Sequence, residues 1–154
     1  MNVRKVDVVR RTRFSAGEFQ ARRQRVYDSI GPDACALLQG APAARGFTDF
    51  RQWNTFFYLS GLEVPHAYLL LDGGARRTTA YVPPRGDGAL AEGAAPGIED
   101  ADLIQELSGV DVVRDPGRLT EDLAGAGIIY TPYAPAEATG GARPELYLAN
   151  RMAA

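Results

Sequence analysis

Few side chains in this sequence could do chemistry. Among its 154 residues there is one histidine, His66, and one cysteine, Cys35. A metal site of the histidine–cysteine type needs several such ligands, and these two residues cannot supply them. A serine–histidine–aspartate triad would have to use His66, yet no serine lies in a Gly-x-Ser-x-Gly turn that would expose a nucleophile. We therefore expect no catalytic residue in this chain, and we expect Cys35 to be a small core residue.

Carboxylates and glycines offer two further kinds of site. Glu99, Asp100 and Asp102 are close in sequence, but these positions on a helix do not converge on one point. A solvated, acidic helix N-terminus, which the helix dipole favours, explains them better. The glycine-rich stretch 86–97 lacks the spacing of a phosphate-binding loop. The sequence thus predicts no metal site and no phosphate site.

The stretch FRQWNTFFYLSGLEVPHAYLLLD, residues 50–72, joins Arg51 and Gln52 to a cluster of aromatic residues. This mixture is too short for a nucleic-acid face. A net charge of −2 supplies no general attraction to nucleic acid or to a membrane surface. No apolar run approaches the roughly 18 residues of a membrane span. Because there is no disulfide framework, we expect a reducing, cytoplasmic location.

A helix is predicted after Ser15, where the sequence carries a complete start signal. Ser15 and Glu18 have the spacing of a capping box, and Phe14 and Phe19 have that of a hydrophobic staple. Gly31 is expected to end the helix. One face of the helix is predicted to carry Phe19, Val26 and Ile30. The arginines are predicted to lie mostly around its sides: Arg22, Arg23 and Arg25.

Apolar runs separated by turn residues predict the strands. Residues 67–71 form a continuous apolar run, as in a central strand covered on both faces. The turn at 72–75 joins this strand to 77–82 in an antiparallel hairpin. Further elements alternate along the chain: strands at 33–38, 111–113 and 127–130, and helices at 98–107 and 116–123. This order predicts an α/β fold, a three-layer α/β/α sandwich with a mixed sheet of five to six strands.

Residues 54–60 have two readings. Asn54 as the N-cap and Gly61 just past the end favour a two-turn helix. The strand propensity of the aromatic residues 56–58 favours a strand. Both ends carry a suitable cap, so we expect the helix.

One domain is expected, at residues 1–130, followed in 131–154 by a linker and the start of a helix. Residues 131–142 are linker-like, and residues 144–154 have the pattern of a helix that the sequence leaves unfinished. We therefore expect a further domain after this chain.

The stretch 50–72 resembles the signature of the N-terminal domain of Xaa-Pro aminopeptidases, prolidases and creatinases. The resemblance covers residues 14–130 in the right order. The pieces that carry it are Arg51-Gln52, the aromatic run from Phe56 to Gly61, Pro65 with the strand after it, the first helix at 19–25, and the Gly-Val-Asp of 109–111.

The sequence also departs from this family pattern. Trp53 and Thr55 stand where the family usually has acidic or amide residues, and Glu63 stands one place earlier than in the usual Glu-Pro pair. Aminopeptidase P relatives often carry Trp-x-Gly after the hairpin, whereas residues 90–93 read Leu-Ala-Glu-Gly. That tryptophan can reach a neighbouring subunit's active site, so this contribution is not expected here.

The resemblance implies an accessory role. In this family such a domain precedes a pita-bread catalytic domain that binds two divalent metals, typically manganese, through acidic residues and histidine. A chain whose only histidine is His66 cannot hold that set. We therefore expect no cofactor here and two manganese ions in the absent domain. The accessory domain would contribute to oligomer contacts and would limit access to short Xaa-Pro peptides. The alternative is a stand-alone protein- or peptide-binding module, since the same domain type occurs in the FACT histone chaperone.

The partners that the resemblance implies are the missing catalytic domain and sister subunits, in a homodimer or a larger homo-oligomer. Arginine and tyrosine are enriched at interface hot spots. Arg51 has an alternative role, because it could bond carbonyls of its own domain. Tyr58 is expected to be core, with a loss of stability when it is replaced. The residues predicted to lie at the interface or to control substrate access are Arg51, Gln52, Asn54, Tyr58 and Glu63.

Overall fold

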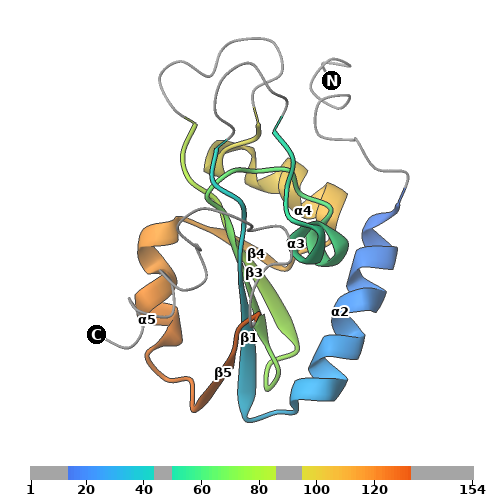
Figure 1. The fold of residues 1–154 in the computed structure, drawn as a ribbon, viewed down its shortest axis with the longest axis vertical. Coiled ribbons are helices and arrows are strands. Elements are labelled where there is room, and N and C mark those ends of the chain that lie inside the picture. The colour runs from blue at the N-terminus through green and yellow to red at the C-terminus, as the bar shows by residue number, and fades with distance from the viewer. Residues whose placement is uncertain (1–13, 44–49, 86–94, 133–154) are drawn as a thin grey trace, which may run out of the picture.

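The structure is a computed structural model that describes residues 14–43, 50–85 and 95–132. Helices and strands alternate along the chain, as predicted (Figure 1). The elements are α2 (Ala16–Ile30), β1 (Ala34–Gln39), α3 (Asn54–Ser60), β2 (Tyr68–Asp72), β3 (Arg77–Tyr81), η1 (Ile98–Asp100), α4 (Ala101–Ser108), β4 (Val112–Arg114), η2 (Pro116–Arg118), α5 (Leu119–Leu123) and β5 (Ile128–Tyr130).

Within the described residues, five strands form one mixed sheet in the order β4-β3-β2-β1-β5. β2 is antiparallel to β1 and β3, whereas β5 is parallel to β1 and β4 is parallel to β3. The hairpin predicted at 72–75 is confirmed. The central position predicted for residues 67–71 is also confirmed, because β2 is the third strand of the five. Successive leucines of β2 are buried against opposite faces of the sheet, as the continuous apolar run requires.

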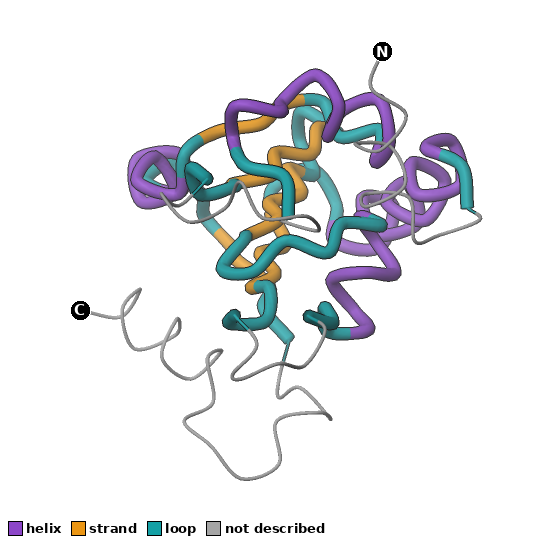
Figure 2. Tube along the Cα trace, turned by 90° about the horizontal axis from the view of Figure 1, so that it is seen from above, coloured by secondary structure: helices purple, strands orange, loops and turns teal. Residues whose placement is uncertain are grey.

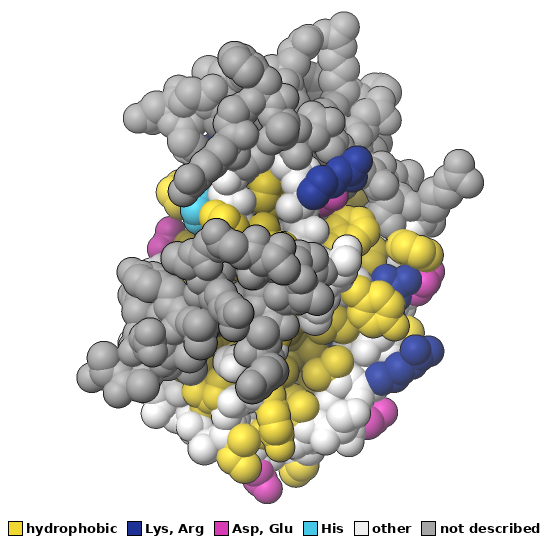
Figure 3. Space-filling view, in the orientation of Figure 1, with side chains coloured by type: hydrophobic (Ala, Val, Ile, Leu, Met, Phe, Trp, Pro, Cys, Tyr) yellow, Lys and Arg dark blue, Asp and Glu magenta, His cyan; other side chains and the backbone are white. Residues whose placement is uncertain are grey.

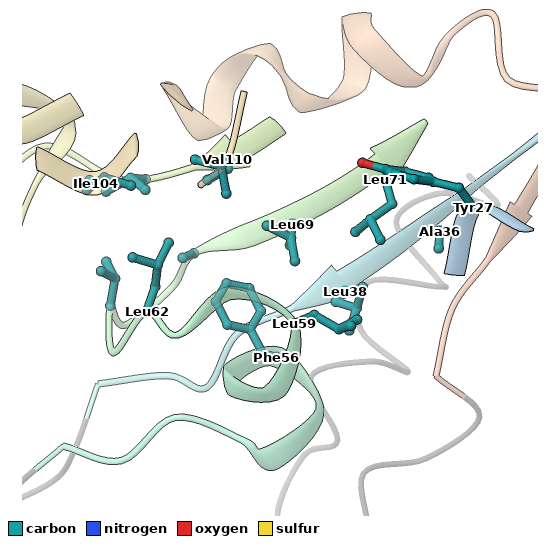
Figure 4. Packing of buried hydrophobic residues seen from close by; sticks show 14 residues of the cluster. Tyr27, Ala36, Leu38, Phe56, Leu59, Leu62, Leu69, Leu71, Ile104 and Val110 are labelled. Atoms are coloured by element: carbon teal, nitrogen blue, oxygen red, sulfur yellow. The ribbon is translucent and has the colours of Figure 1, made fainter. Parts of the chain in front are cut away.

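Helices cover both faces of the sheet and give the predicted three-layer sandwich. Helices α2, α3 and α4 lie on one face, and the η2–α5 segment lies on the other, so helices flank the strands on both sides when the molecule is seen from above (Figure 2). The larger apolar cluster lies under α2, α3 and α4. In it, Phe56 and Leu59 of α3 reach toward Leu38 and Leu69 of the sheet (Figure 4). The smaller cluster joins the opposite face to α5: Leu37, Leu70, Tyr81 and Leu119.

The start of α2 is confirmed by its caps. The Ser15 hydroxyl accepts a hydrogen bond from the Glu18 N–H at 3.3 Å. The rings of Phe14 and Phe19 meet edge to face, with 6.2 Å between their centroids. The Gly31 N–H donates to the Tyr27 carbonyl, which closes the last turn of the helix.

The prediction that the three arginines lie mostly around the sides of α2 is wrong, because two of them are buried. Arg25 is exposed, but Arg22 and Arg23 are only 9% and 1% exposed. Their partners explain the burial, since both guanidinium groups donate to the last carbonyls of α3. A periodicity argument treats every arginine as a polar surface residue and cannot foresee such partners.

Arg23 is bound by the ends of two helices. It donates from Nη1 to the carbonyls of Leu59 (2.8 Å) and Ser108 (3.1 Å), and from Nη2 to that of Gly109 (2.5 Å). The last carbonyls of a helix have no partner within the helix and lie at the negative end of its dipole. Burial lowers the pKa of the Arg23 guanidinium, against the opposing charges of Tyr27 and Asp111. Arg23 therefore joins α2 to the C-terminal ends of α3 and α4.

Helix α3 confirms the helical reading of residues 54–60, but its N-cap is displaced by one residue. Trp53 is the N-cap, because its carbonyl accepts the first helical bond, from the Phe57 N–H at 2.9 Å. Asn54, predicted as the N-cap, is instead the first helical residue. Gly61 ends the helix in the left-handed region at φ 68°, as predicted.

The bounds of the remaining elements agree with the predicted bounds to within a few residues. The predicted helix 98–107 is a 3₁₀ turn, η1, followed by α4, and the predicted helix 116–123 is η2 followed by α5. Asp115 caps η2 by accepting from the Gly117 N–H at 2.8 Å. The loop at 86–94, and the linker and helix predicted within 133–154, lie outside the described residues.

Candidate functional site

Arg51 lies just before α3 and presents most of its side chain to solvent. Its Nη1 lies 3.3 Å from Oε1 of Glu63, which belongs to the loop after α3. The Arg51 side chain is 69% exposed and the Glu63 side chain 17%. An exposed ion pair contributes at most about 1 kcal/mol to stability, so Arg51 is not there chiefly to hold the fold. Arg51 and Glu63, both predicted site residues, are thus brought together.

Asn54 and Tyr58 are one turn apart on the exposed side of α3. The prediction that Tyr58 is a core residue is wrong, because its side is open to solvent and it is 48% exposed. In this two-turn helix, Phe56 and Leu59 take the inward positions. Tyr58 therefore remains available to a partner.

Tyr58 packs against Arg22 in a surface cluster that we call the Arg22 stack, formed by Phe14, Arg22 and Tyr58. The guanidinium carbon of Arg22 lies 4.4 Å from the ring centroid of Phe14 and 4.4 Å from that of Tyr58. Arg22 also donates to the Tyr58 carbonyl at 2.9 Å and to the Glu18 carboxylate at 2.5 Å. The two rings and these bonds fix the guanidinium between them.

The Arg22 stack was not predicted as part of the site. Phe14 is 46% exposed, although the sequence marks it only as half of a helix-start staple. The available signal was the arginine placed one turn after Glu18 and next to that staple. On the side of the molecule that carries α2, hydrophobic side chains alternate with basic and acidic ones at the surface (Figure 3).

Gln52 lies inside the domain and not beside Arg51 at the surface. It is 8% exposed, and its amide serves three backbone groups. Its Oε1 accepts from the N–H groups of Ala41 (2.6 Å) and Trp53 (2.9 Å), and its Nε2 donates to the Val64 carbonyl at 3.0 Å. Gln52 therefore fixes the chain on both sides of α3 to the end of β1.

We expect Gln52→Leu to lower the free energy of unfolding by about 2–4 kcal/mol. The leucine fills similar space but leaves a buried N–H and a buried carbonyl without partners, at about 1–3 kcal/mol each. Denaturant unfolding measures the change. The matched control is Asn54→Leu at an exposed helical position, which should shift stability by less than about 0.5 kcal/mol. An equal effect of the two substitutions would contradict this role for Gln52.

The acidic group at 99–102 is partly paired rather than solvated, which corrects the prediction. The Glu99 carboxylate accepts from the Arg85 N–H at 3.2 Å, and Asp100 forms an ion pair with the Arg85 guanidinium. Asp100 raises the pKa of Arg85 through this hydrogen bond and its charge. Asp102 is exposed. Across the described ranges, no group of three histidine, cysteine, aspartate or glutamate side chains is placed to hold a metal ion.

His66 and Cys35 both have contacts within the domain. His66 is exposed, has a positive φ of 58°, and accepts a hydrogen bond at Nε2 from the Ala43 N–H at 3.2 Å. Cys35 is half-buried beside the smaller apolar cluster, close to the core position predicted for it. Burial, together with the nearby Asp72 charge, raises the pKa of its thiol.

In the part of the chain that is described, no helix is long and apolar enough to cross a membrane.

The fold and this surface define a class of protein before any relative is considered. It is an α/β domain in which the buried side chains of Arg23 and Gln52 bond backbone groups of the domain itself, while Arg51 and Tyr58 are exposed around α3. The model of the aminopeptidase P N-terminal domain matches residues 19–127. The chain belongs to this family. No curated protein sequence matches it.

Solved structures of longer proteins share the fold. Aminopeptidase P from E. coli, in a complex with the inhibitor Pro-Leu, is 22% identical with a TM-score of 0.68, and the match covers 91% of this chain and 33% of that one. A low-pH form of the E. coli enzyme is 26% identical with a TM-score of 0.66, over 83% and 31%. Icp55 from Saccharomyces cerevisiae is 22% identical with a TM-score of 0.70, over 91% and 33%. The chain thus spans about a third of the length of these relatives.

Proposed function

We propose that this chain is the non-catalytic N-terminal domain of an Xaa-Pro aminopeptidase of the aminopeptidase P type. The family match over residues 19–127 is the observation that carries the proposal. The length of the solved relatives supports it, because about two thirds of each lies outside the match. The catalytic centre, with two manganese ions, would belong to that remaining part, and the whole protein would act on short Xaa-Pro peptides in the cytoplasm.

The exposed surface around α3 gives this domain its role in the proposal. Arginine, tyrosine and tryptophan are the residue types that most often carry binding energy at protein interfaces, and Arg51 and Tyr58 are two of these types. Tyr58 and Arg22 are already held in place by the Arg22 stack, so little side-chain entropy is lost when a partner covers them. A sister subunit seated here would bring the two chains together and narrow the path by which peptides reach the catalytic centre.

We expect this surface to drive association of the chain into a homodimer. Arg51→Ala and Tyr58→Ala should each weaken the dimer at least tenfold, the effect of losing one strong interface residue. Because both side chains are exposed, the free energy of unfolding should change by no more than about 1 kcal/mol. Sedimentation velocity across a concentration series measures association, and denaturant unfolding measures stability.

The matched control is Arg118→Ala, since Arg118 forms an exposed ion pair with Glu121 at the start of α5 and not near α3. This variant should associate as the unaltered chain does. If the unaltered chain is a monomer at every concentration, or if the α3 variants associate normally, the proposed interface is wrong. A loss of several kcal/mol of stability in Tyr58→Ala would instead show that the Tyr58 ring chiefly stabilises the fold.

A further inference from the structure

Residues 116–130, which run from η2 through α5 to β5, are held to the domain by few buried side chains. Leu119 is the one residue of this segment that is buried. Leu123 and Ile129 are half-buried against the smaller apolar cluster, and the first and last residues of β5 are exposed. Local stability follows the density of buried apolar contacts. We therefore expect this segment to be less stable locally than β2, whose leucines are buried on both faces of the sheet.

β5 is attached at the edge of the sheet. Among the described strands it comes last in the order β4-β3-β2-β1-β5, so it pairs with β1 alone. The pairing is parallel and joins residues 128–130 to residues 34–36. Parallel pairs are slightly less stable per residue than antiparallel ones. β5 can therefore leave the sheet without breaking any pairing among β1, β2, β3 and β4.

Asp122 of α5 bonds the segment to the sheet. Its Oδ2 accepts from the Tyr81 hydroxyl at 2.7 Å, and its Oδ1 accepts from Nη1 of Arg114 at 2.6 Å. Burial raises the pKa of Tyr81, and the hydrogen bond and charge of Asp122 raise it further, against the charges of Arg114 and Arg77. The Tyr81 hydroxyl thus remains a donor. Within the described residues, no other side chain of 116–130 forms a hydrogen bond or an ion pair with the sheet.

α5 and β5 depend on each other for their apolar contacts. Helix α5 lies apart from α2, α3 and α4 (Figure 1). Leu119 of α5 and Ile129 of β5 pack against the same smaller cluster, and only the short connection 124–127 separates the two elements. If α5 leaves the sheet, Ile129 loses apolar neighbours and β5 keeps little besides its edge pairing. The two elements should therefore open together.

We propose that residues 116–130 form a strap that opens as one unit while the rest of the domain stays folded, and that Asp122 is the latch that holds the strap closed. Opening uncovers the edge of β1 and the side chains of Leu37 and Leu70. An uncovered strand edge is a template for pairing with another chain, so access to this edge depends on the latch. The strap is separate from the α3 surface and does not depend on the proposed function.

Hydrogen–deuterium exchange of the full chain, followed by NMR at single amides, tests whether the strap opens by itself. In the unaltered protein, the hydrogen-bonded amides of α5 and of the β1–β5 pairing should be at least about tenfold less protected than those of β2. A low concentration of denaturant should speed exchange more in β2, because global unfolding exposes more surface than local opening. Equal protection and equal denaturant dependence in the strap and in β2 would overturn the proposal, whether or not any variant folds.

Two variants test the latch. Tyr81→Phe removes only the hydroxyl that donates to Asp122 and leaves the sequence of the strap unchanged. Asp122→Asn removes the charge of the latch at nearly constant shape. Each should speed exchange in α5 and in the β1–β5 pairing by about ten- to a hundredfold, the effect of losing a hydrogen bond to a charged group. Amides of β2 should keep their protection.

The matched control is Glu121→Gln, in the residue next to Asp122. Glu121 forms an exposed ion pair with Arg118 of η2 and has no bond to the sheet. Exchange in the strap should be unchanged in that variant. If Glu121→Gln acts as Asp122→Asn does, or if the latch variants speed exchange equally in β2, Asp122 is not the latch. Faster exchange in α5 without faster exchange in the β1–β5 pairing would show that the two elements do not open as one unit.

Discussion

Replacing Arg23 by methionine should lower the free energy of unfolding by about 3–5 kcal/mol. Methionine matches the length of the arginine stem but leaves the carbonyls of Leu59, Ser108 and Gly109 without their shared donor. Each buried carbonyl that loses its partner costs about 1–3 kcal/mol, and removal of the buried charge returns part of that sum. Denaturant unfolding measures the loss.

Two further variants separate the guanidinium geometry from the charge. Arg23→Lys keeps the charge but cannot direct donors at three carbonyls, so we expect about half the loss of Arg23→Met. Arg25→Met removes an exposed arginine from the same helix and should cost less than about 0.5 kcal/mol. If Arg23→Met and Arg25→Met are equally stable, the joining of the three helices by Arg23 is not a source of stability.

Gly61→Ala should also destabilise the protein strongly, by about 3–4 kcal/mol. A non-glycine residue in the left-handed region costs about 1–2 kcal/mol. At Gly61 a Cβ atom would also lie 2.4 Å from the ring of Phe19, which is fully buried. The ring has little room to withdraw, so overpacking adds about 1–3 kcal/mol. Thermal and denaturant unfolding of the variant measure the sum.

Gly109→Ala is the control that shares the backbone strain without the ring. Gly109 has φ 65°, and its Cβ would meet the flexible Gln20 side chain at 2.9 Å and the Ala16 carbonyl oxygen at 3.0 Å. We expect it to cost about 1–2 kcal/mol. A Gly61→Ala variant no less stable than Gly109→Ala would show that the Phe19 ring moves aside.

Local signals in the sequence were sufficient for most of the fold. Ser15 and Gly61 mark helix ends through bonds made within a few residues, and the apolar run 67–71 marks the central strand through its composition alone. The turn at 72–75 predicted the pairing of β2 with β3, but the order of the other strands was not predicted. Errors of one residue, as at Asn54, arise because the cap is set by which carbonyl accepts the first helical bond.

The environment of the site residues could not be predicted in the same way. Arg23 binds carbonyls 36, 85 and 86 positions away in sequence, and no periodicity encodes such partners. Gln52 was grouped with Arg51 because they are adjacent, yet its bonds to Ala41 and Val64 place it inside the domain. In the two-turn α3, the aromatic run also gave no indication that Tyr58 faces outward.

The neighbouring arginines of α2 bear on how the open surface can change during evolution. Arg22 and Arg23 bond the consecutive carbonyls of Tyr58 and Leu59, one near solvent and one in the interior. The direction of α3 is therefore set by the same bonds that hold the core together. Side chains on its outer side can be exchanged to suit a new partner, but the helix cannot be re-aimed without a loss of folding. Diversity among relatives should accordingly appear in the chemistry of this surface and not in its orientation.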